Sequence, residues 1–229
     1  MLGKNKLKKF AENETFENMV QVRREDILEK GLPQKGKWRQ FFFKNDRPLV
    51  LELGCGKGEY TIGLAEMFPK KNFIGIDIKG ARMWRGARTA SDNLMKNVGF
   101  LRTQIELLQL CFEKGEVDEI WITFPDPQIK YRRRRKRLTA PDMLRMYSSI
   151  LAEDASIHLK TDSQFLHGYT LGVIEGNNYQ VLEAMYDIDK QNPGNQLLQI
   201  KTNYEQIFRQ KGFPITYIKF RLNEGNIKH

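Results

Sequence analysis

From Pro48 onward, short apolar runs alternate with longer amphipathic stretches. This alternation is typical of strands joined by crossover helices around a parallel sheet. The apolar runs predict seven strands, over residues 49–53, 73–77, 98–102, 119–124, 156–161, 179–184 and 215–220. The stretches between them predict helices over residues 59–68, 79–96, 104–114, 140–152, 163–175 and 203–211. We therefore expect an α/β fold in which helices cover both faces of a seven-stranded, mostly parallel sheet.

The first 45 residues show no sustained hydrophobic period. They carry scattered lysines and arginines and an aromatic cluster at Phe41, Phe42 and Phe43. We predict a basic N-terminal arm over residues 1–45 that docks through its aromatic side chains. Residues 46–229 are then expected to form a single domain.

The net charge of the chain indicates which class of partner it binds. The chain has 38 Lys and Arg against 28 Asp and Glu, a net charge of +10, which favours an anionic partner, nucleic acid before an acidic membrane. Cys55 and Cys111 are the two cysteines, so we expect neither a disulfide framework nor a metal site. The chain has no run of about 20 apolar residues and no secretory signal pattern. A cytoplasmic protein is expected.

The segment LELGCGKGEY places Gly54, Gly56 and Gly58 between a predicted buried strand and a helix. Glycines here permit a tight turn and let backbone N–H groups approach a ligand at the helix N-terminus. A dinucleotide site requires G-x-G-x-x-G, and the third glycine comes one residue early, which disfavours a nicotinamide coenzyme. Glu52 lies inside the strand, and Asp77 ends the next one, where a carboxylate accepts hydrogen bonds from both ribose hydroxyls.

The pattern E-x-G-x-G-x-G with an acid at the end of the next strand resembles the S-adenosylmethionine site of the seven-stranded, class I methyltransferases. The resemblance covers most of the chain from Pro48 onward and implies their Rossmann-like fold. It implies S-adenosylmethionine as cofactor, bound by Glu52, Gly54, Gly56, Gly58 and Asp77. Gln104, which opens the helix after the third predicted strand, is expected at the adenine or ribose end of the cofactor, or else as an ordinary surface residue at a helix start.

The most specific stretch, ITFPDPQIKYRRRRKRL, begins at the end of the fourth predicted strand. Pro125 and Pro127 flank Asp126 and restrict the backbone on both sides, which holds the carboxylate at the carboxyl edge of the sheet. Seven of the eight residues from Lys130 to Arg137 are basic. Because this run continues directly from a candidate site, we predict that it binds substrate phosphates rather than forming a merely solvated face.

This stretch resembles the signature F-P-D-P-W-x-K-x-(R/H)-H-x-(K/R)-R-(R/L) of the tRNA (guanine-N7)-methyltransferases. LKTD at 159–162 matches the family's acid after the fifth strand, and TNYEQ at 202–206 matches its late T-x-(F/Y)-E segment. Two departures stand out. Gln128 and Ile129 replace the usual aromatic residue and the one after it, and Gln104 stands where an acidic residue or Asn is common.

The resemblance implies a methyltransferase that modifies N7 of guanine 46 in the variable loop of tRNA, with the base turned outward into the site. Guanine N7 carries a lone pair and no proton, so methyl transfer needs no general base. The product ring is cationic, and we assign Asp126 as the carboxylate that stabilises this charge. Asp126 is also expected to bind the cofactor. Lys130 is expected to hold a phosphate or the base carbonyl. Asp162 is expected to meet the guanine edge, to orient Lys130 or to cap the following helix.

The resemblance also implies a substrate-binding segment and an RNA-binding surface. Four residues are expected to close over the base, namely Thr202, Asn203, Tyr204 and Glu205. Phosphate contacts are expected from Arg132, Arg133, Arg134, Arg135, Lys136 and Arg137, with the N-terminal Lys4, Lys6, Lys8 and Lys9. The expected partner is therefore tRNA, with no membrane and no obligate protein partner, and monomer and homodimer both stay open.

Three rival functions remain at this point. A non-catalytic RNA-binding protein would use the arginine run and bind no cofactor, but the candidate cofactor residues are all in place. A nicotinamide oxidoreductase is disfavoured by the glycine spacing and by the absence of a candidate proton donor. The third rival is a methyltransferase that acts on ribosomal RNA or on a small molecule. The seven clustered cations argue against a small molecule but not against another RNA.

Overall fold

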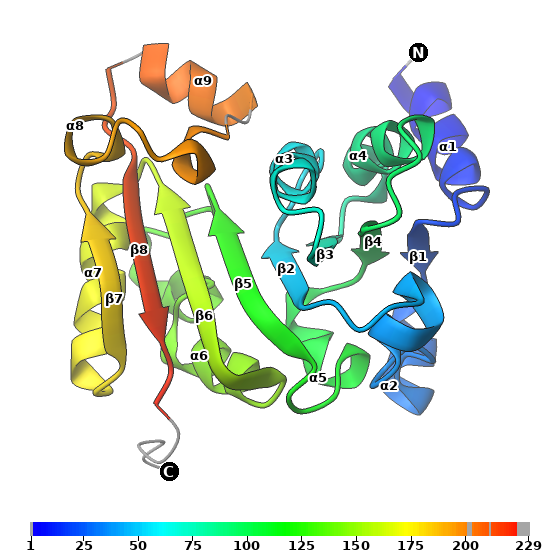
Figure 1. The fold of residues 1–229 in the computed structure, drawn as a ribbon, viewed down its shortest axis with the longest axis horizontal. Helices are drawn as coiled ribbons and strands as arrows, with labels where there is room; N and C mark the ends of the chain where they lie inside the picture. The colour runs from blue at the N-terminus through cyan, green and yellow to red at the C-terminus, as the bar shows by residue number, and fades with distance from the viewer. Residues whose placement is uncertain (1, 201–202, 211, 224–229) are drawn as a thin grey trace.

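The computed structural model describes residues 2–200, 203–210 and 212–223. Eight strands form one sheet in the order β1-β4-β3-β2-β5-β6-β8-β7 (Figure 1). Strand β8 is antiparallel to its neighbours β6 and β7, and the other neighbouring pairs are parallel. The strands are β1 (Met19–Gln21), β2 (Leu49–Leu53), β3 (Asn72–Asp77), β4 (Val98–Arg102), β5 (Val117–Thr123), β6 (Leu151–Thr161), β7 (Gln180–Met185) and β8 (Thr216–Arg221).

The predicted α/β class and mostly parallel sheet are confirmed, with eight strands in place of seven. The additional strand is β1, which pairs in parallel with β4 at the edge of the sheet. It has only three residues, Met19–Gln21, too few for a period-2 pattern to be visible in the sequence.

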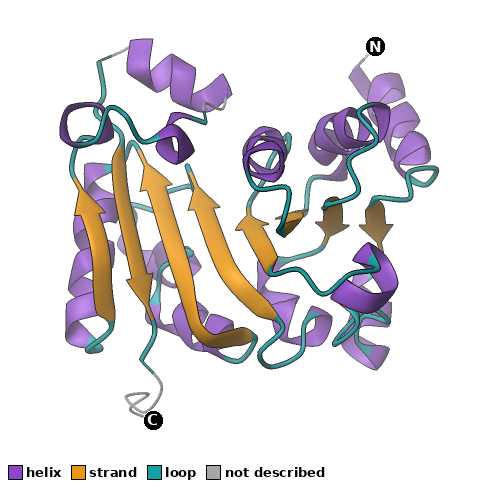
Figure 2. Cartoon of the chain, in the orientation of Figure 1, coloured by secondary structure: helices purple, strands orange, loops and turns teal. Residues whose placement is uncertain are grey.

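The helices lie on both sides of the sheet, as Figure 2 shows in purple. The α-helices are α1 (Leu2–Asn13), α2 (Arg24–Lys30), α3 (Glu59–Met67), α4 (Gly80–Asp92), α5 (Leu108–Cys111), α6 (Pro141–Ser148), α7 (Gln164–Gly176), α8 (Ile188–Gln191) and α9 (Asn203–Gln210). Shorter turns are a π-helix, η1 (Trp38–Phe43), and the 3₁₀ helices η2 (Ile105–Leu107), η3 (Tyr131–Lys136) and η4 (Gln196–Gln199). The helix predicted over 104–114 is thus divided between η2 and α5.

Strand β2 shows how the sheet separates two cores. Leu49, Leu51 and Leu53 belong to the core beneath α2, α6 and α7. Val50 points to the opposite face, into the core formed with α3 and α4. Because side chains alternate along a strand, Glu52 lies on the same face as Val50, toward α3. This alternation brings a carboxylate into an otherwise apolar layer.

The N-terminal segment is built into the same sheet. Besides contributing β1, it buries Ile27 of α2 and Trp38 of η1 in the main core. The Trp38 ring stacks on Phe112, with ring centroids 5.4 Å apart, and its Nε1 donates a hydrogen bond to the Cys111 carbonyl at 2.9 Å. The segment therefore packs on the main core through Trp38, whereas Phe41 of the expected aromatic cluster is 67% exposed. The domain boundary at residue 45 stays a prediction.

Strand order determines where a ligand can bind. Strand β2 pairs with β3 on one side and with β5 on the other, so the crossover connections run in opposite directions from it. In open α/β sheets, ligands bind outside the carboxyl ends of the strands at this switch point. Among the helices that the structure describes, none is long and apolar enough to cross a membrane.

Candidate functional site

A cleft of about 360 Å³ opens at the switch point, where the carboxyl ends of β2, β3, β5 and β6 meet. Six residues expected to bind cofactor or substrate from the sequence line it together: Glu52, Gly54, Gly56, Asp77, Asp126 and Asp162. The structure therefore joins side chains that lie up to 110 positions apart in the chain. Besides the four acids among these six residues, Glu59, Lys57 and Arg82 line the cleft. The cleft thus has five carboxyl groups and two cationic side chains, and this excess of acidic groups favours a cationic ligand.

The glycine loop after β2 is fastened to the end of β3. The N–H groups of Gly54 and Cys55 donate to the Ile76 carbonyl at 2.8 and 3.0 Å, and the Gly56 N–H donates to Asp77 Oδ2 at 3.0 Å. These amides are used within the protein, contrary to the expectation that they approach a ligand. A Cβ added at Gly54 would meet nothing within 4 Å, so the bare loop leaves open space beside the cleft.

The third glycine serves packing instead of the cleft. Gly58 has a φ of +74° and begins α3, and an added Cβ would lie 2.5 Å from the Phe100 ring. A side chain would be strained by both the backbone conformation and the neighbouring ring. Gly58 thus brings α3 close to β4, as close helix–strand packing requires.

Asp77 is oriented before any ligand arrives. Its Oδ1 accepts a hydrogen bond from the Lys79 N–H at 2.8 Å, and its Oδ2 accepts the one from Gly56. Because each carboxylate oxygen has further acceptor capacity, Asp77 can still accept hydrogen bonds from two ligand hydroxyls. The structure therefore agrees with the predicted geometry of a ribose-binding acid.

Glu52 is a buried carboxyl at the floor of the cleft, only 3% exposed. It accepts hydrogen bonds from the hydroxyls of Thr61 and Thr123, the latter at 2.7 Å. Burial raises the pKa of Glu52 from 4.5 to about 7, although the two hydroxyls oppose that rise. The supporting threonines were not predicted, because each is an ordinary polar residue in its own segment.

Asp126 lies on a conformationally constrained loop at the end of β5. Phe124 and Gln128, on either side of the Pro-Asp-Pro sequence, both have a φ of +47°, a conformation that costs most side chains free energy and clusters at functional sites. The Gln128 N–H donates to Asp126 Oδ1 at 3.0 Å. The side chain of Asp126 is exposed, so the loop holds a ready acceptor at the mouth of the cleft.

Asp162 follows β6 and lines the cleft opposite the glycine loop. Partial burial raises the pKa of its carboxyl. The alternative role as a helix cap is wrong, because the N-cap of α7 is Ser163, whose Oγ accepts a hydrogen bond from the Leu166 N–H at 3.2 Å. Asp162 is thus left facing the cleft.

The basic run forms the 3₁₀ helix η3, which Lys130 precedes as its N-cap. Lys130 is exposed and does not line the cleft. Arg134 is half-buried, with its guanidinium 4.1 Å from the centre of the Tyr131 ring. Four further cations of the run are exposed, namely Arg132, Arg133, Arg135 and Lys136. Arg137 differs, because it is only 6% exposed. Its expected phosphate contact does not agree with this burial.

Glu205, expected to close over the substrate, is buried at the start of α9. Its Oε2 accepts a hydrogen bond from Lys160 Nζ at 2.8 Å, and neither side chain is exposed. Lys160 also donates to the carbonyls of Leu198 and Ile200, at 2.6 and 3.0 Å. Burial lowers the pKa of Lys160 to about 8, although Glu205 opposes that change. Lys160 thus fastens Leu198, Ile200 and Glu205 to β6.

Three neighbours of Glu205 complete the predicted substrate segment. Thr202 lies outside the described residues, and Asn203 and Tyr204 are described only as the first turn of α9. Of the N-terminal lysines expected to contact phosphates, Lys4 is described only as part of α1. Lys6 and Lys8 of the same helix have exposed side chains.

Gln104 lies outside the main cleft, in an adjoining hollow of about 300 Å³ at the ends of β1 and β4. Its Oε1 accepts a hydrogen bond from Arg24 Nε at 3.0 Å. Ile78, which directly follows Asp77, lines the same hollow and is 51% exposed. The hollow of Gln104 therefore begins at the residue that follows Asp77 of the main cleft.

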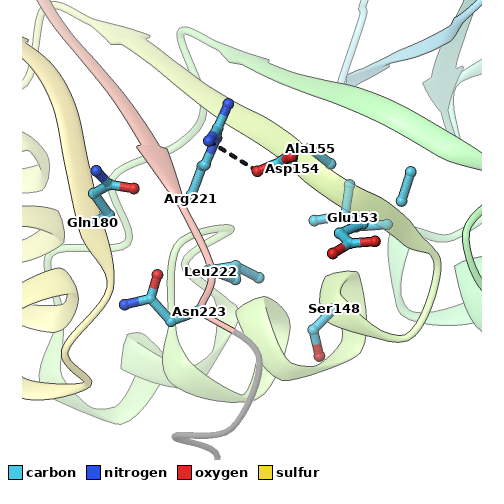
Figure 3. A pocket seen from close by; sticks show the side chains of 10 residues that line it. Ser148, Glu153, Asp154, Ala155, Gln180, Arg221, Leu222 and Asn223 are labelled. Atoms are coloured by element: carbon cyan, nitrogen blue, oxygen red, sulfur yellow. Dashed lines mark hydrogen bonds and ion pairs between the residues drawn. The ribbon is translucent and has the colours of Figure 1, made fainter.

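Another hollow, of about 400 Å³, lies where β6 begins and β8 ends (Figure 3). There Arg221 forms an ion pair with Asp154 at 3.0 Å. No residue predicted for cofactor or substrate lines it, and it lies at the amino end of β6, away from the switch point. The cleft at the switch point is therefore the candidate site.

Sequence comparison identifies relatives over nearly the whole chain. Residues 46–218 match a family described as "Putative methyltransferase". A tRNA (guanine-N(7)-)-methyltransferase of Christiangramia forsetii is 55% identical over 223 residues, which are 97% of this chain and 100% of the relative. A relative of the same name from Porphyromonas gingivalis is 52% identical, covering 88% of this chain and 82% of its own.

Solved structures agree on the fold. The 16S rRNA methyltransferase KamB matches with a TM-score of 0.61 at 14% identity, covering 89% of this chain and 95% of its own. A SAM-dependent methyltransferase from Aquifex aeolicus matches with a TM-score of 0.54 at 12% identity, covering 89% and 100%. The fold is thus the Rossmann-like fold of methyltransferases. Given its identity to full-length relatives and the motif residues gathered in its cleft, the chain belongs to the tRNA (guanine-N(7)-)-methyltransferase family.

Proposed function

We propose that this protein transfers a methyl group from S-adenosylmethionine to N7 of guanine 46 in the variable loop of tRNA. The observation that carries the proposal is the meeting of Glu52, Asp77, Asp126 and Asp162 in one cleft, with exposed cations directly beyond the loop of Asp126. The names of the relatives support the same reaction. We further propose that the protein acts in the cytoplasm without an obligate protein partner, and that residues 46–229 form its catalytic domain.

The residues of the cleft fit the cofactor. Asp77 offers both carboxylate oxygens to a ribose diol, and the open space beside Gly54 admits a ligand close to the backbone. The excess of carboxylates suits a sulfonium cation. The adjoining hollow, with exposed Ile78 and the Gln104 amide, would take the adenine end. Glu52, buried beneath the loop, would support the site from below.

When bound, the cofactor supplies an electrophilic methyl group on its sulfonium. The protein's task is then to place guanine N7 in line with that methyl, and good positioning can contribute roughly 7–11 kcal/mol. N7 has no proton to remove, and accordingly none of the proposed roles is that of a general base. Asp162, on the opposite side of the cleft, would bind the guanine edge.

Asp126 is proposed as the catalytic carboxylate. Methylation of N7 leaves a positive charge on the guanine ring, and a carboxylate held near it stabilises that charge in the transition state. Its Oδ1 already accepts the Gln128 N–H, which orients the group, while its exposed side chain can accept guanine N1–H or N2–H. The constrained loop therefore provides a preorganised acceptor.

The RNA would lie across η3. The guanidinium and ammonium groups of Arg132, Arg133, Arg135 and Lys136 are exposed, and such groups bind phosphates with a salt-dependent affinity. Lys130, at the start of η3, lies between this surface and Asp126 and would hold a phosphate of the target nucleotide or its base carbonyl. Lys6 and Lys8 of α1 would add contacts further along the tRNA.

The decisive experiment is methyl transfer from labelled S-adenosylmethionine to unmodified tRNA, mapped by chain cleavage at N7-methylguanine. Label at the variable-loop guanine, lost when that guanine is replaced by adenine, is the expected result. Binding of the cofactor with label only on ribosomal RNA would contradict the choice of substrate. Binding of tRNA without binding of the cofactor would favour the non-catalytic RNA-binding alternative.

A further inference from the structure

Arg137, the last cation of the basic run, is turned away from the surface that its neighbours form. Arg132, Arg133, Arg135 and Lys136 are exposed, whereas Arg137 is 6% exposed. It directly follows η3, in extended conformation, where the chain turns back toward the core. A phosphate contact from Arg137 would require this side chain to leave its site.

The guanidinium of Arg137 binds the backbone of the Asp126 loop. Its Nε lies 3.3 Å from the carbonyl oxygens of both Pro127 and Gln128, and its Nη2 donates to the Gln128 oxygen at 3.1 Å. Among the described residues no carboxylate forms an ion pair with it. The fixed fork of donors in a guanidinium suits this two-point contact, which an ammonium cannot reproduce.

Two aromatic rings of α7 complete the site of Arg137. Its guanidinium carbon lies 4.7 Å from the Phe165 ring centre and 4.3 Å from that of Tyr169. These residues are four positions apart on one face of α7, and their rings stack at an angle of 18°. Cation–π contacts of this kind stabilise a desolvated guanidinium.

From Arg137 two hydrogen bonds lead to the catalytic carboxylate. The Gln128 carbonyl accepts from Arg137, and the Gln128 N–H donates to Asp126 Oδ1 at 3.0 Å. Gln128 can do both because its φ of +47° turns its peptide groups out of the extended path. That conformation is costly for a residue other than glycine, so it requires support from outside the loop.

We propose that Arg137 is a positioning residue, which holds the loop of Asp126 in its active conformation and makes no contact with RNA. This inference rests on the proposed role of Asp126 in methyl transfer. Arg137 thereby couples α7, which directly follows Asp162 and Ser163, to the loop of Asp126 on the same side of the cleft. The basic run therefore has two tasks, with its exposed members facing RNA and its last member supporting the catalytic loop.

The test compares Arg137→Gln and Arg137→Lys with Arg135→Gln, a matched removal of one exposed cation from the same run. Arg137→Gln should lower kcat at saturating tRNA and cofactor by about 10–100-fold, the scale of a small misplacement of reacting groups. Its cofactor affinity and the salt dependence of tRNA binding should stay those of the wild type. Arg137→Lys should give an intermediate kcat, because it keeps the charge without the fork.

Arg135→Gln should do the reverse, reducing the log–log salt slope of tRNA affinity by roughly 0.7–0.9. Amide hydrogen exchange supplies a readout that needs no activity. Exchange in residues 124–130 should accelerate at least about tenfold in Arg137→Gln and stay unchanged in Arg135→Gln. If wild-type protein transfers no methyl group, the proposed function fails, while the exchange comparison still decides the role of Arg137.

Two outcomes would overturn the proposal. A reduced salt slope in Arg137→Gln with unchanged loop exchange would show an RNA contact. A joint fall of melting temperature, cofactor affinity and tRNA affinity, with faster exchange throughout the sheet, would show a merely structural role.

Discussion

The two walls of the cleft are built in different ways. On the side of β2 and β3, backbone N–H groups of the glycine loop donate to the end of β3, at the Ile76 carbonyl and the Asp77 carboxylate. On the side of β5 and β6, Asp126 lies on a constrained loop that Arg137 supports, and the buried Lys160 binds Glu205 of α9. The wall formed by the glycine loop and Asp77, called the cofactor wall below, is thus held by backbone donors. The wall on the side of β5 and β6, called the substrate wall, depends instead on the buried cationic side chains of Arg137 and Lys160.

The difference between the two walls shows for which residues a sequence motif predicts the role of the side chain reliably. In the glycine loop, Gly54 and Gly56 line the cleft where their spacing predicts them, whereas Gly58 packs against Phe100. In the substrate motifs, Arg137 and Glu205 belong to recognisable runs but point inward. Membership of a motif therefore indicates a region of the molecule, and burial decides what each side chain does there.

The largest effect expected on the substrate wall is that of Asp126→Asn. The neutral amide keeps the shape of the loop but loses the charge that stabilises the cationic ring, so kcat should fall by about 10²–10³-fold. Methyl transfer at saturating tRNA measures it, with cofactor binding expected to be unchanged. Asp46→Asn, at an exposed acid away from the cleft, is the control. A fall of kcat below about threefold would remove Asp126 from the catalytic role.

The second-largest expected effect is on stability, from removal of the buried ion pair between Lys160 and Glu205 behind the substrate wall. Lys160→Met should lower the free energy of unfolding by about 3 kcal/mol, the low end for breaking a buried pair, because Glu205 keeps its contact with Arg209 at 2.7 Å. Urea unfolding measures this change. Lys190→Met removes the exposed ion pair with Asp187 and should cost at most about 1 kcal/mol. Equal losses in the two variants would contradict the comparison.

On the cofactor wall, the expected effect depends on pH. The folded-state pKa of Glu52 is raised to about 7, so its protonation stabilises the fold below about pH 4.5, and this contribution is lost as the pH rises through 7. Glu52→Gln stays neutral, so its stability relative to wild type should improve by on the order of 2 kcal/mol between about pH 5 and pH 8. Urea unfolding at the two pH values tests this. A constant difference between the variants would show that Glu52 is ionised throughout.

The smallest expected effects lie on the exposed surface of η3. Arg132→Gln and Arg133→Gln should each reduce the log–log salt slope of tRNA affinity by roughly 0.7–0.9. Binding titrations at several salt concentrations measure the slope. Lys114→Gln, at an exposed lysine before the amino end of β5, should leave the slope unchanged. An equal reduction in all three variants would mean that the basic run has no special place in binding.

Most of the fold could be predicted from the sequence because its strands are continuous apolar runs. The seven predicted strands are all present, and Gly54, Gly56 and Asp77 lie at the site as their spacing indicates. The strand β1 was missed because three residues carry no period. The cap role considered for Asp162 was wrong because Ser163, one residue later, also caps helices well and lies in the better position.

The sequence by itself determined the class of fold, the glycine loop, the strand-end acids and the family, because each is visible as an order of residue types along the chain. Only the tertiary structure decided that Arg137 supports a loop instead of facing solvent, and that Glu205 pairs with Lys160 in the interior. Both outcomes depend on partners 9 to 45 positions away and on the desolvation of a charge. Neither spacing nor composition records whether a charged side chain is buried, since burial is a property of the packed chain.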